Sequence, residues 1–443
     1  MKYLKNITII FILLIIFCTS SVFSTGTVTY TKPSDITTYS PCCLLMESKT
    51  GKVIYEKNGY EKMYPASTTK IMTAILTLEH CELTDVATAS YEAVFTVPVG
   101  YTNANIQVGE ELTVNQLLHV LLISSANEAA NVLAEHIAGS VESFVTMMNT
   151  KAEEIGCLNT HFVNANGVHN ENHYSTAYDL AIIGKYAMQN ETFRQIVNTT
   201  FYTLPSTNKY PTNDRVFGTT NELIKKDTSD RVDNYYYEYA TGAKTGYTNA
   251  AKNCIVATAK KDDIEYIVVI LGAQTTENGL SARYLDCKNL FNYAFENYTI
   301  KTIYEEGSIL KKTKIPKASI ATKNLNVVIE NEITVLLKKD TNINELTPTV
   351  ELNSDLKAPI SENTIIGKIT YEVDGNTYTS NLLAGGNVVE SNAFNTFLTV
   401  GSIILVLFLL YKLLKTDDKR KKRKRKRKKN SNSYSGKGNY LYW

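Results

Sequence analysis

The stretch Pro65-Ala66-Ser67-Thr68-Thr69-Lys70 leads directly into the apolar run Ile71-Met72-Thr73-Ala74-Ile75-Leu76. The apolar residues have helical spacing, and serine and threonine are typical of a helix start. The sequence therefore predicts a helix over residues 67–79. Because Ser67 and Lys70 are three residues apart on that helix, we expect their side chains to share a face and to meet.

A serine and a lysine in that arrangement can form an activated nucleophile and its base. Burial of the apolar face would bring Lys70 into a partly desolvated site, which lowers the pKa of a lysine. A lysine that is neutral for part of the time can accept the hydroxyl proton of a serine at the positive end of a helix. The alternative is a capping serine beside a surface lysine, and Ser-x-x-Lys alone is too short and too common to decide.

A second polar motif, Ser125-Ala126-Asn127, lies between two apolar stretches with helical spacing, 114–122 and 128–137. The motif therefore occupies the bend between two predicted helices. Polar side chains at such a bend either cap the helices or face a cavity, and the sequence leaves both interpretations open.

A third motif, Lys244-Thr245-Gly246, stands just before a predicted hairpin with strands 253–259 and 264–272. We expect the motif to lie on a strand next to that hairpin. Gly246 removes a side chain where a ligand would have to approach the backbone closely. The alternative is an ordinary strand that enters a turn.

These three motifs, in this order and with gaps of 58 and 119 residues, resemble those of the serine D-alanyl-D-alanine carboxypeptidases, the low-molecular-mass penicillin-binding proteins. The likeness runs from about residue 42 to residue 298 and continues in a carboxy-terminal β domain. Stretches 124–137, 159–167, 174–184 and 241–247 support it. The sequence departs from the family at Ala126, where relatives often have glycine, and at Asn166, where some relatives have histidine.

The resemblance implies an α/β (α+β) catalytic domain of the β-lactamase and transpeptidase type. It also implies that Ser67 is the acyl-ester nucleophile, that Lys70 takes its proton, and that Ser125 relays a proton to the departing D-alanine. Substrate-binding roles would fall to Asn127, Lys244, Thr245, Gly246, Tyr247 and Arg283. The oxyanion hole would be formed by the backbone N–H groups of Ser67 and Tyr247.

The implied reaction removes the terminal D-alanine from peptidoglycan stem pentapeptides, and β-lactams would acylate Ser67 as slow substrates. Acyl transfer through a serine ester requires no metal and no cofactor. A DD-endopeptidase, a β-lactamase or a catalytically silent peptidoglycan-binding scaffold remain alternatives. The intact motifs argue against the scaffold, and the carboxy-terminal segments argue against a β-lactamase, which is normally a secreted single domain.

At 443 residues with 44% hydrophobic content, the chain is long enough for two domains. Its net charge of +2 hides an asymmetry, because residues 25–394 hold only 30 of the 46 basic residues but 42 of the 44 acidic ones, a net charge near −12. An acidic body is a poor candidate for nucleic-acid binding, which requires neutralisation of phosphates.

Residues 1–24 have a basic start, an apolar stretch and small residues before Thr25, as in an export signal peptide. An uncleaved amino-terminal anchor is the alternative. The mature chain would retain Cys42, Cys43, Cys81, Cys157, Cys254 and Cys287. These are scattered without a Cys-x-x-Cys pair, so we expect buried free thiols and no metal site.

The predicted organisation is a catalytic domain over residues 25–300 and a small β-sandwich-like domain over 301–388. The family resemblance implies that this second domain is a spacer that lifts the catalytic domain from the membrane, and a docking surface for a partner is the alternative. Residues 391–411 carry no charge and would span roughly 31 Å as a helix, enough to cross a membrane. The tail, 412–443, is strongly basic, and the positive-inside rule places it in the cytoplasm with the catalytic domain outside.

Overall fold

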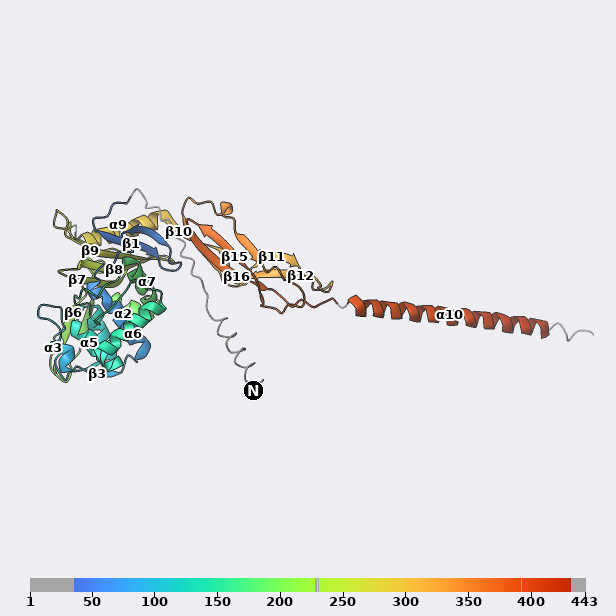
Figure 1. Cartoon of the computed structure of the whole chain (residues 1–443), viewed down its shortest axis with the longest axis horizontal. Helices are drawn as coiled ribbons and strands as arrows, with labels where there is room; N and C mark the ends of the chain where they lie inside the picture. The colour runs from blue at the N-terminus through green and yellow to red at the C-terminus, as the bar shows by residue number, and fades with distance from the viewer. Residues whose placement is uncertain (1–35, 228, 230, 392, 432–443) are drawn as a thin grey trace, which may run out of the picture. The chain divides into compact units, whose positions relative to one another are not determined.

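The computed structural model describes residues 36–227, 229, 231–391 and 393–431 (Figure 1). The predicted signal peptide and the end of the basic tail lie outside these residues. The chain forms two compact units. The first extends to Ile303 and also includes Thr334–Thr347 and Glu372–Tyr378, and the second comprises Tyr304–Ile333, Pro348–Tyr371 and the residues from Thr379 onward.

The first unit is built on an antiparallel sheet with the strand order β2-β1-β9-β8-β7. The strand predicted for Lys244-Thr245-Gly246 and the two strands of the predicted hairpin are confirmed as β7, β8 and β9, and β1 and β2 complete the sheet. Their bounds are β1 Cys42–Glu47, β2 Val53–Lys57, β7 Ala240–Thr248, β8 Lys252–Lys261 and β9 Ile264–Ala273. Cys42 of β1 pairs with Leu271 of β9, so the sheet joins the start of the described chain to the Lys244 region.

Side chains of the sheet alternate between two hydrophobic cores, as the two-residue period of a strand requires. Leu44 and Val269 pack into the core formed with most of the helices, whereas Leu45 and Val268 pack into the core formed with α9. Figure 1 shows α9 on one side of the sheet and α2, α5 and α6 on the other. The helices are α2 Lys70–His80, α3 Tyr91–Phe95, α4 Val114–Leu122, α5 Asn127–Ala138, α6 Val141–Glu154, α7 Ala177–Ala187, α8 Glu191–Val197 and α9 Ala282–Asn297.

The start of the first predicted helix is different from the expectation. Residues Ala66–Thr69 form a 3₁₀ turn, η1, and the α-helix begins only at Lys70. The side chain of Ser67 caps neither helix. The backbone changes direction here because Ala66 takes a left-handed conformation with φ 49°. Ser67 therefore lies on a tight turn before the helix, where its hydroxyl is left for other contacts.

Two short antiparallel strand pairs border the helical core, and the sequence patterns did not predict them. They are β3 Val86–Thr88 with β4 Glu111–Thr113, and β5 Phe201–Leu204 with β6 Arg215–Gly218. With three or four residues each, such strands are too short for a clear two-residue period.

The six described cysteines form no disulfide with one another, as predicted, and all but Cys81 are buried. Burial raises the pKa of Cys42 to about 12, so this thiol stays protonated and unreactive.

The carboxy-terminal strands confirm the predicted all-β character. One sheet has the order β11-β12-β16-β15-β14, and a separate pair joins β10 and β13. The bounds are β10 Tyr298–Tyr304, β11 Ile309–Lys314, β12 Asn324–Ile329, β13 Ile333–Lys338, β14 Thr349–Leu352, β15 Ile365–Val373 and β16 Asn376–Ala384, with a short 3₁₀ turn η2 at Ile343–Glu345. Asp374 and Gly375, both with positive φ, form the tight turn between β15 and β16.

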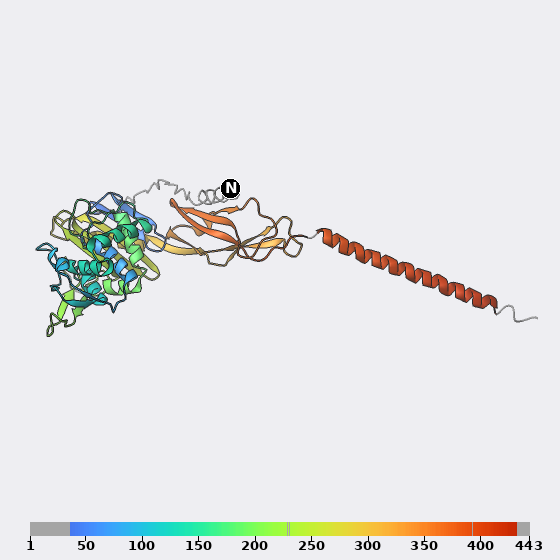
Figure 2. The ribbon, with the colours of Figure 1, turned by 60° about the horizontal axis from the view of Figure 1, so that its bottom comes forward.

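The last described element is a single helix, α10, that runs from Ala393 to Ser431 (Figure 2). It contains one candidate membrane span, with a mean hydropathy of 2.4 over its most apolar window. The basic residues from Lys412 to Lys429 continue this helix. Lysine and arginine favour helix, and no glycine or proline interrupts the segment.

Candidate active site

Lys70 lies at the centre of a polar cluster beneath the surface of the first unit. Its side chain is fully buried. Its Nζ is 3.0 Å from Ser67 Oγ, 2.8 Å from Asn127 Oδ1 and 2.5 Å from the backbone oxygen of Asn166. The structure thus brings Ser67, Lys70 and Asn127 together, although they come from a 3₁₀ turn, α2 and α5.

The partners of Lys70 determine where its lone pair can point. Burial holds the pKa of Lys70 well below the ordinary lysine value, and the charge of Lys244 lowers it further, whereas Glu128 raises it. The oxygens of Asn127 and Asn166 can only accept hydrogen bonds. A neutral Lys70 therefore donates its two N–H groups to them, and its lone pair is left for the hydroxyl proton of Ser67.

The bend that carries Ser125 and Asn127 faces a cavity. Ala126 is the N-cap residue of α5 and no side chain caps this helix, so the capping interpretation is wrong. Asn127 is instead fixed by the backbone oxygen of Thr102. This oxygen accepts hydrogen bonds from Asn127 Nδ2 at 2.7 Å and from the backbone N–H of Asn127 at 3.1 Å. Ser125 Oγ forms no hydrogen bond with the residues that the structure describes, and its side chain lines the cavity.

Strand β7 forms the opposite side of the site. Lys244 is buried, and burial together with the positive charge of Arg283 lowers the pKa of Lys244 to about 7. Thr245 Oγ1 lies 2.6 Å from Thr220 Oγ1. Tyr247 is 57% exposed. Arg283 of α9 reaches the same strand, where its Nη1 donates to the Gly246 oxygen at 3.4 Å.

Gly246 is required by the turn that carries Ser67. A Cβ at this position would lie 2.9 Å from the Ser67 backbone nitrogen and 3.1 Å from the Pro65 oxygen. The sequence predicts a close approach of a ligand at Gly246. The structure shows in addition a close approach of the protein's own backbone.

A cavity of about 570 Å³ opens above these groups. The predicted site residues on its surface are Ser67, Ser125, Asn127, Thr245, Gly246, Tyr247 and Arg283. Lys70 and Lys244 do not line the cavity, because both are buried beneath it.

Several cavity residues were missed from the sequence, namely Val99, Gly100, Tyr101, Thr102, His169, Thr220, Thr248, Asn249 and Ala250. The residues 99–102 and Thr220 belong to loops without a periodic pattern, and only their distance in space to the three motifs identifies them. His169, four residues from His173 in sequence, faces this cavity, whereas His173 is buried with its Nε2 2.8 Å from Thr69 Oγ1.

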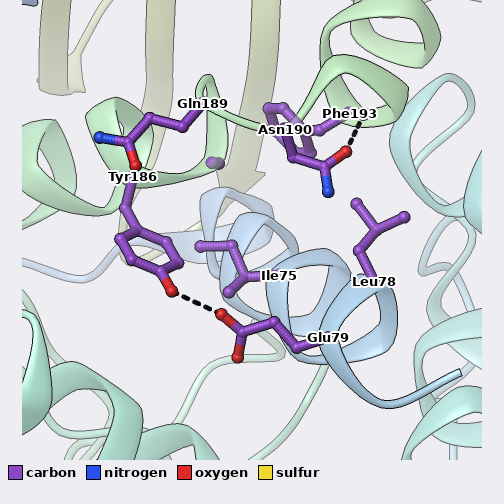
Figure 3. A pocket seen from close by; sticks show the side chains of 8 residues that line it. Ile75, Leu78, Glu79, Tyr186, Gln189, Asn190 and Phe193 are labelled. Carbon is purple, nitrogen blue, oxygen red and sulfur yellow. Dashed lines mark hydrogen bonds between the residues drawn. The ribbon is translucent and has the colours of Figure 1, made fainter.

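A separate cavity of about 210 Å³ lies between α2 and the residues 186–193 (Figure 3). Its floor is formed by Ile75 and Leu78, and Tyr186 donates a hydrogen bond of 2.6 Å to Glu79 Oε1 at its edge. None of the predicted catalytic side chains lines it. The larger cavity is therefore the candidate active site.

Glu128 supports the wall of the active-site cavity. Its carboxylate is buried, and Oε1 accepts hydrogen bonds from the backbone N–H of Ala104 at 2.5 Å and of Ile106 at 3.3 Å. Oε2 is also buried and has no hydrogen-bond partner among the described residues. Glu128 therefore fixes the segment that follows the cavity residues 99–102.

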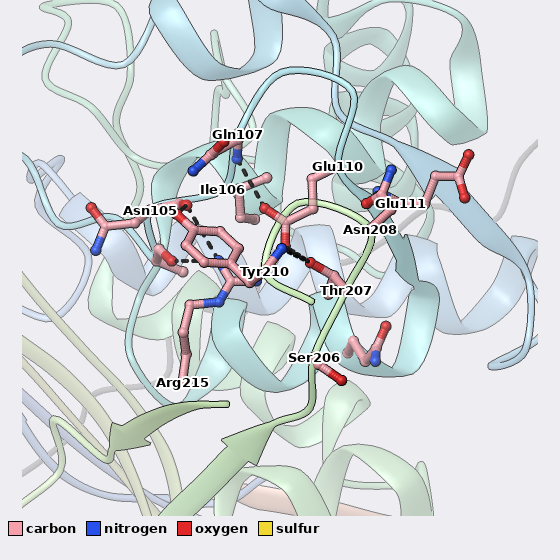
Figure 4. A network of polar contacts seen from close by, with 12 residues as sticks. Asn105, Ile106, Gln107, Glu110, Glu111, Ser206, Thr207, Asn208, Tyr210 and Arg215 are labelled. Carbon is pink, nitrogen blue, oxygen red and sulfur yellow. Dashed lines mark hydrogen bonds and ion pairs between the residues drawn. The ribbon is translucent and has the colours of Figure 1, made fainter. Parts of the chain in front are cut away.

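The hairpin β5–β6 supports the same segment from outside (Figure 4). Glu110 forms a buried ion pair with Arg215 and accepts a further hydrogen bond from Thr207 Oγ1 at 2.8 Å. Arg215 also donates to the Ala104 oxygen at 3.1 Å, and its guanidinium lies 4.1 Å from the centre of the Tyr210 ring. The cavity wall is thus anchored on both sides before any ligand binds.

The loop that supplies the Asn166 oxygen is packed directly against the turn that carries Ser67. Gly167 has φ +82°, and a Cβ there would lie 2.0 Å from the Ala66 oxygen and 3.0 Å from the Ser67 nitrogen. An added methyl group can be accommodated only if the turn or the loop moves.

We therefore expect Gly167→Ala to lower, by 10-fold or more, the rate of the acylation that the motifs predict at Ser67, because about 1 Å of displacement at a reacting group costs roughly 100-fold. Stopped-flow acylation with a chromogenic β-lactam measures this rate. Gly156→Ala is the matched control, because Gly156 also has a positive φ but a Cβ added there would meet nothing within 4 Å. Equal acylation rates for the two variants would contradict the proposed contact.

Comparison with known proteins decides the family. The sequence pattern of the D-alanyl-D-alanine carboxypeptidases matches residues 27–275, and that of the penicillin-binding protein 5 C-terminal domain matches residues 298–390. The chain belongs to the D-alanyl-D-alanine carboxypeptidase family. The enzyme is 32% identical over 375 residues to the D-alanyl-D-alanine carboxypeptidase DacF of Bacillus subtilis, which covers 83% of this chain and 90% of the relative.

Solved structures agree with this assignment. The enzyme superposes on penicillin-binding protein 5 of Haemophilus influenzae with a TM-score of 0.67 and 25% identity, covering 82% of this chain and 100% of the other. The Streptomyces K15 DD-transpeptidase matches with a TM-score of 0.52 and 32% identity over 60% of this chain and 99% of its own. These comparisons confirm three predictions: the family resemblance that the motifs indicated, the fold class, and the serine-type carboxypeptidase activity.

Proposed function

We propose that this serine-type D-alanyl-D-alanine carboxypeptidase uses Ser67 as its acyl-ester nucleophile and Lys70 as the base that activates it. The observation that supports this most strongly is the set of contacts at Lys70 Nζ. Two obligate acceptors hold its N–H groups, so the lone pair of the neutral amine is directed at Ser67 Oγ, 3.0 Å away.

The proposed reaction proceeds in two steps. Lys70 takes the proton of Ser67 as Oγ attacks the carbonyl carbon between the two D-alanines, and the oxyanion is held by the N–H groups of Ser67 and Tyr247. The C–N bond then breaks, and Ser125 relays a proton to the departing D-alanine amine. In the second step water attacks the ester, Ser67 leaves with a proton, and the shortened peptide is released.

The terminal carboxylate of the substrate would bind at β7. Arg283 and Thr245 line the cavity, and Lys244 adds positive charge from below. Gly246, Tyr247 and Asn127 would position the peptide backbone along the strand. β-Lactams place a carboxylate and a strained amide in the same positions, so we expect them to acylate Ser67 and to be hydrolysed slowly.

We also infer that the enzyme is exported and anchored by α10, with its catalytic unit outside and its basic residues in the cytoplasm. The apolar part of α10 is long enough to span a membrane and is followed by a dense run of lysine and arginine. The carboxy-terminal β strands would act as the spacer between that anchor and the catalytic domain.

A peptide-release assay tests the proposed function. The full chain in detergent is incubated with a pentapeptide that ends in D-Ala-D-Ala and, separately, with a cross-linked peptide dimer. We expect release of D-alanine from the pentapeptide and little cleavage of the dimer. Faster cleavage of the dimer would identify an endopeptidase, and β-lactam hydrolysis without peptide cleavage would identify a β-lactamase.

Glu128→Gln is expected to change the pH dependence of acylation. The negative charge of Glu128 raises the pKa of Lys70, and the positive charge of Lys244 lowers it. His173 is also close enough to Lys70 for the charge of Lys70 to lower the pKa of His173. Removal of the carboxylate charge makes Lys70 neutral at lower pH. In a plot of acylation rate against pH, the rate rises as Lys70 loses its proton, and we call this rise the rising limb. In Glu128→Gln the rising limb should therefore move to lower pH by roughly half to one pH unit.

The rate of β-lactam acylation between pH 5 and pH 9 measures this shift. Glu110→Gln is the matched control, since Glu110 supports the same wall but does not contribute to the pKa of Lys70. If both variants acylate more slowly but neither shifts the pH at which the rate rises, Glu128 acts only by holding the cavity wall at residues 104 and 106.

A further inference from the structure

Cys81, Asp85 and His136 meet at the end of the first unit's helical core, in a place that neither the motifs nor the proposed reaction uses. Cys81 follows the last residue of α2 and donates its N–H to the Thr77 oxygen at 3.0 Å. His136 lies in the last turn of α5. The Cys81 Sγ, a carboxylate oxygen of Asp85 and a ring nitrogen of His136 all lie within 4.8 Å of one another.

The turn between Cys81 and Asp85 is held in place. The side-chain oxygen Oδ2 of Asp85 accepts a hydrogen bond from the backbone N–H of Glu82 at 2.9 Å. The backbone N–H of Asp85 donates to the backbone oxygen of Glu82 at 3.1 Å, and the backbone oxygen of Asp85 accepts from the Val114 N–H at 2.8 Å. These contacts fix the Asp85 backbone and leave Oδ1 free of hydrogen bonds with the described residues. The position of the acidic ligand is therefore set by the fold.

The other two donor atoms are also available. Neither the Cys81 thiol nor the His136 ring forms a hydrogen bond with a residue that the structure describes. Cys81 and Asp85 are at least partly exposed and His136 is exposed, so an ion can reach all three from solvent. Cysteine sulfur, imidazole nitrogen and carboxylate oxygen are each donor atoms that zinc takes from proteins.

We propose that Cys81, Asp85 and His136 bind one divalent transition-metal ion, with Zn²⁺ as the best fit and water as the fourth ligand. Zinc takes sulfur at about 2.3 Å and nitrogen or oxygen at about 2.0–2.2 Å, so its tetrahedral ligands lie roughly 3.3–3.8 Å apart. Rotation of the exposed side chains can close the remaining difference. The thiolate and imidazole disfavour Mg²⁺ and Ca²⁺, which prefer oxygen ligands alone.

The chemistry of the thiol makes binding depend on pH. Zinc binds the thiolate form of cysteine, whereas an ordinary cysteine thiol is mostly protonated at neutral pH. Zinc binding must release that proton to solvent as the S–Zn bond forms. The affinity is therefore expected to fall as the pH is lowered.

The site would tie together two helices that start at the active site. Lys70 is the first residue of α2 and Asn127 the first of α5, and the metal would join their opposite ends. Because Cys81, Asp85 and His136 do not line the active-site cavity, the ion should stabilise the catalytic unit without taking part in acylation. Sequence patterns do not reveal the site, since Cys81 and His136 are far apart in the chain.

The test uses the untagged full chain in detergent after treatment with a chelator. Competition with a zinc-sensitive dye should show one Zn²⁺ per chain, and Co²⁺ should produce a thiolate-to-cobalt charge-transfer band. We expect Cys81→Ser and His136→Gln each to weaken Zn²⁺ binding by at least 10-fold, and Cys81→Ser to abolish the band. Zn²⁺, but not Mg²⁺, should raise the melting temperature of the unaltered chain.

His80→Gln is the matched control, because His80 is an exposed neighbour of Cys81 that does not belong to the cluster. This variant should bind Zn²⁺ as the unaltered chain does. Covalent labelling by a β-lactam reports that each variant is folded and does not depend on the metal. Absence of stoichiometric binding, or equal affinity in Cys81→Ser, would overturn the proposal.

Discussion

Ser67→Ala should abolish both D-alanine release and β-lactam acylation. Removal of the nucleophile in a serine hydrolase lowers kcat by about 10⁶-fold, since the remaining groups can only position water. The Ser67 hydroxyl caps no helix, and its described hydrogen bond is the one with Lys70. We therefore expect the free energy of unfolding to change by no more than about 1 kcal/mol.

Release of D-alanine and thermal unfolding, measured on the same preparation, test this expectation. Ser124→Ala is the control, because Ser124 lies beside the second motif but donates its hydroxyl to the Val120 oxygen at 2.8 Å, four residues back in the chain. Its activity should be close to that of the unaltered enzyme. A Ser67→Ala variant that still releases D-alanine at an appreciable rate would refute the acyl-serine mechanism.

Lys70→Met should reduce the acylation rate by about 10³-fold, within the range that general bases contribute. Methionine has a similar length and no proton acceptor strong enough to activate Ser67. It also leaves the oxygens of Asn127 and Asn166 without the Lys70 donor, which costs roughly 1–3 kcal/mol for each buried group. The buried amine is removed at the same time, so the net loss of stability should be smaller than that sum.

The pH profile separates a catalytic effect from a structural one. The residual acylation of Lys70→Met should lack the rising limb that reports deprotonation of Lys70, because the titrating group is gone. Lys62→Met is the control, since Lys62 is an exposed lysine that lies over the Tyr174 ring. A Lys70→Met variant with an unchanged rate and an unchanged limb would assign the base to another residue.

The parts of the fold that local patterns determine were predictable. Adjacent residues such as Leu44 and Leu45 face different cores, and strands buried on both faces appear as continuous apolar runs. The helix α7 begins as its sequence suggests, with Thr176 Oγ1 accepting the Asp179 N–H at 3.0 Å. The spacing of Ser67 and Lys70 also predicted their contact, although a 3₁₀ turn rather than an α-helix produces it.

The rest depends on contacts between distant segments. The ion pair of Glu110 with Arg215 and the hydrogen bonds of Glu128 to residues 104 and 106 cross long stretches of sequence. Both involve loops with no periodic pattern, so their role in shaping the cavity is visible only in three dimensions. The sequence also could not predict that a side chain at position 167 is excluded, because the Ala66 oxygen that would clash with it comes from a distant part of the chain.

Mass spectrometry of the full chain after exposure to benzylpenicillin tests whether Ser67 is the nucleophile. We expect a single covalent adduct of the intact antibiotic, located after proteolysis on the peptide that contains Ser67 and absent from Ser67→Ala. An adduct on another residue such as Ser125, or no adduct on a folded protein, would contradict the assignment of Ser67 as the nucleophile.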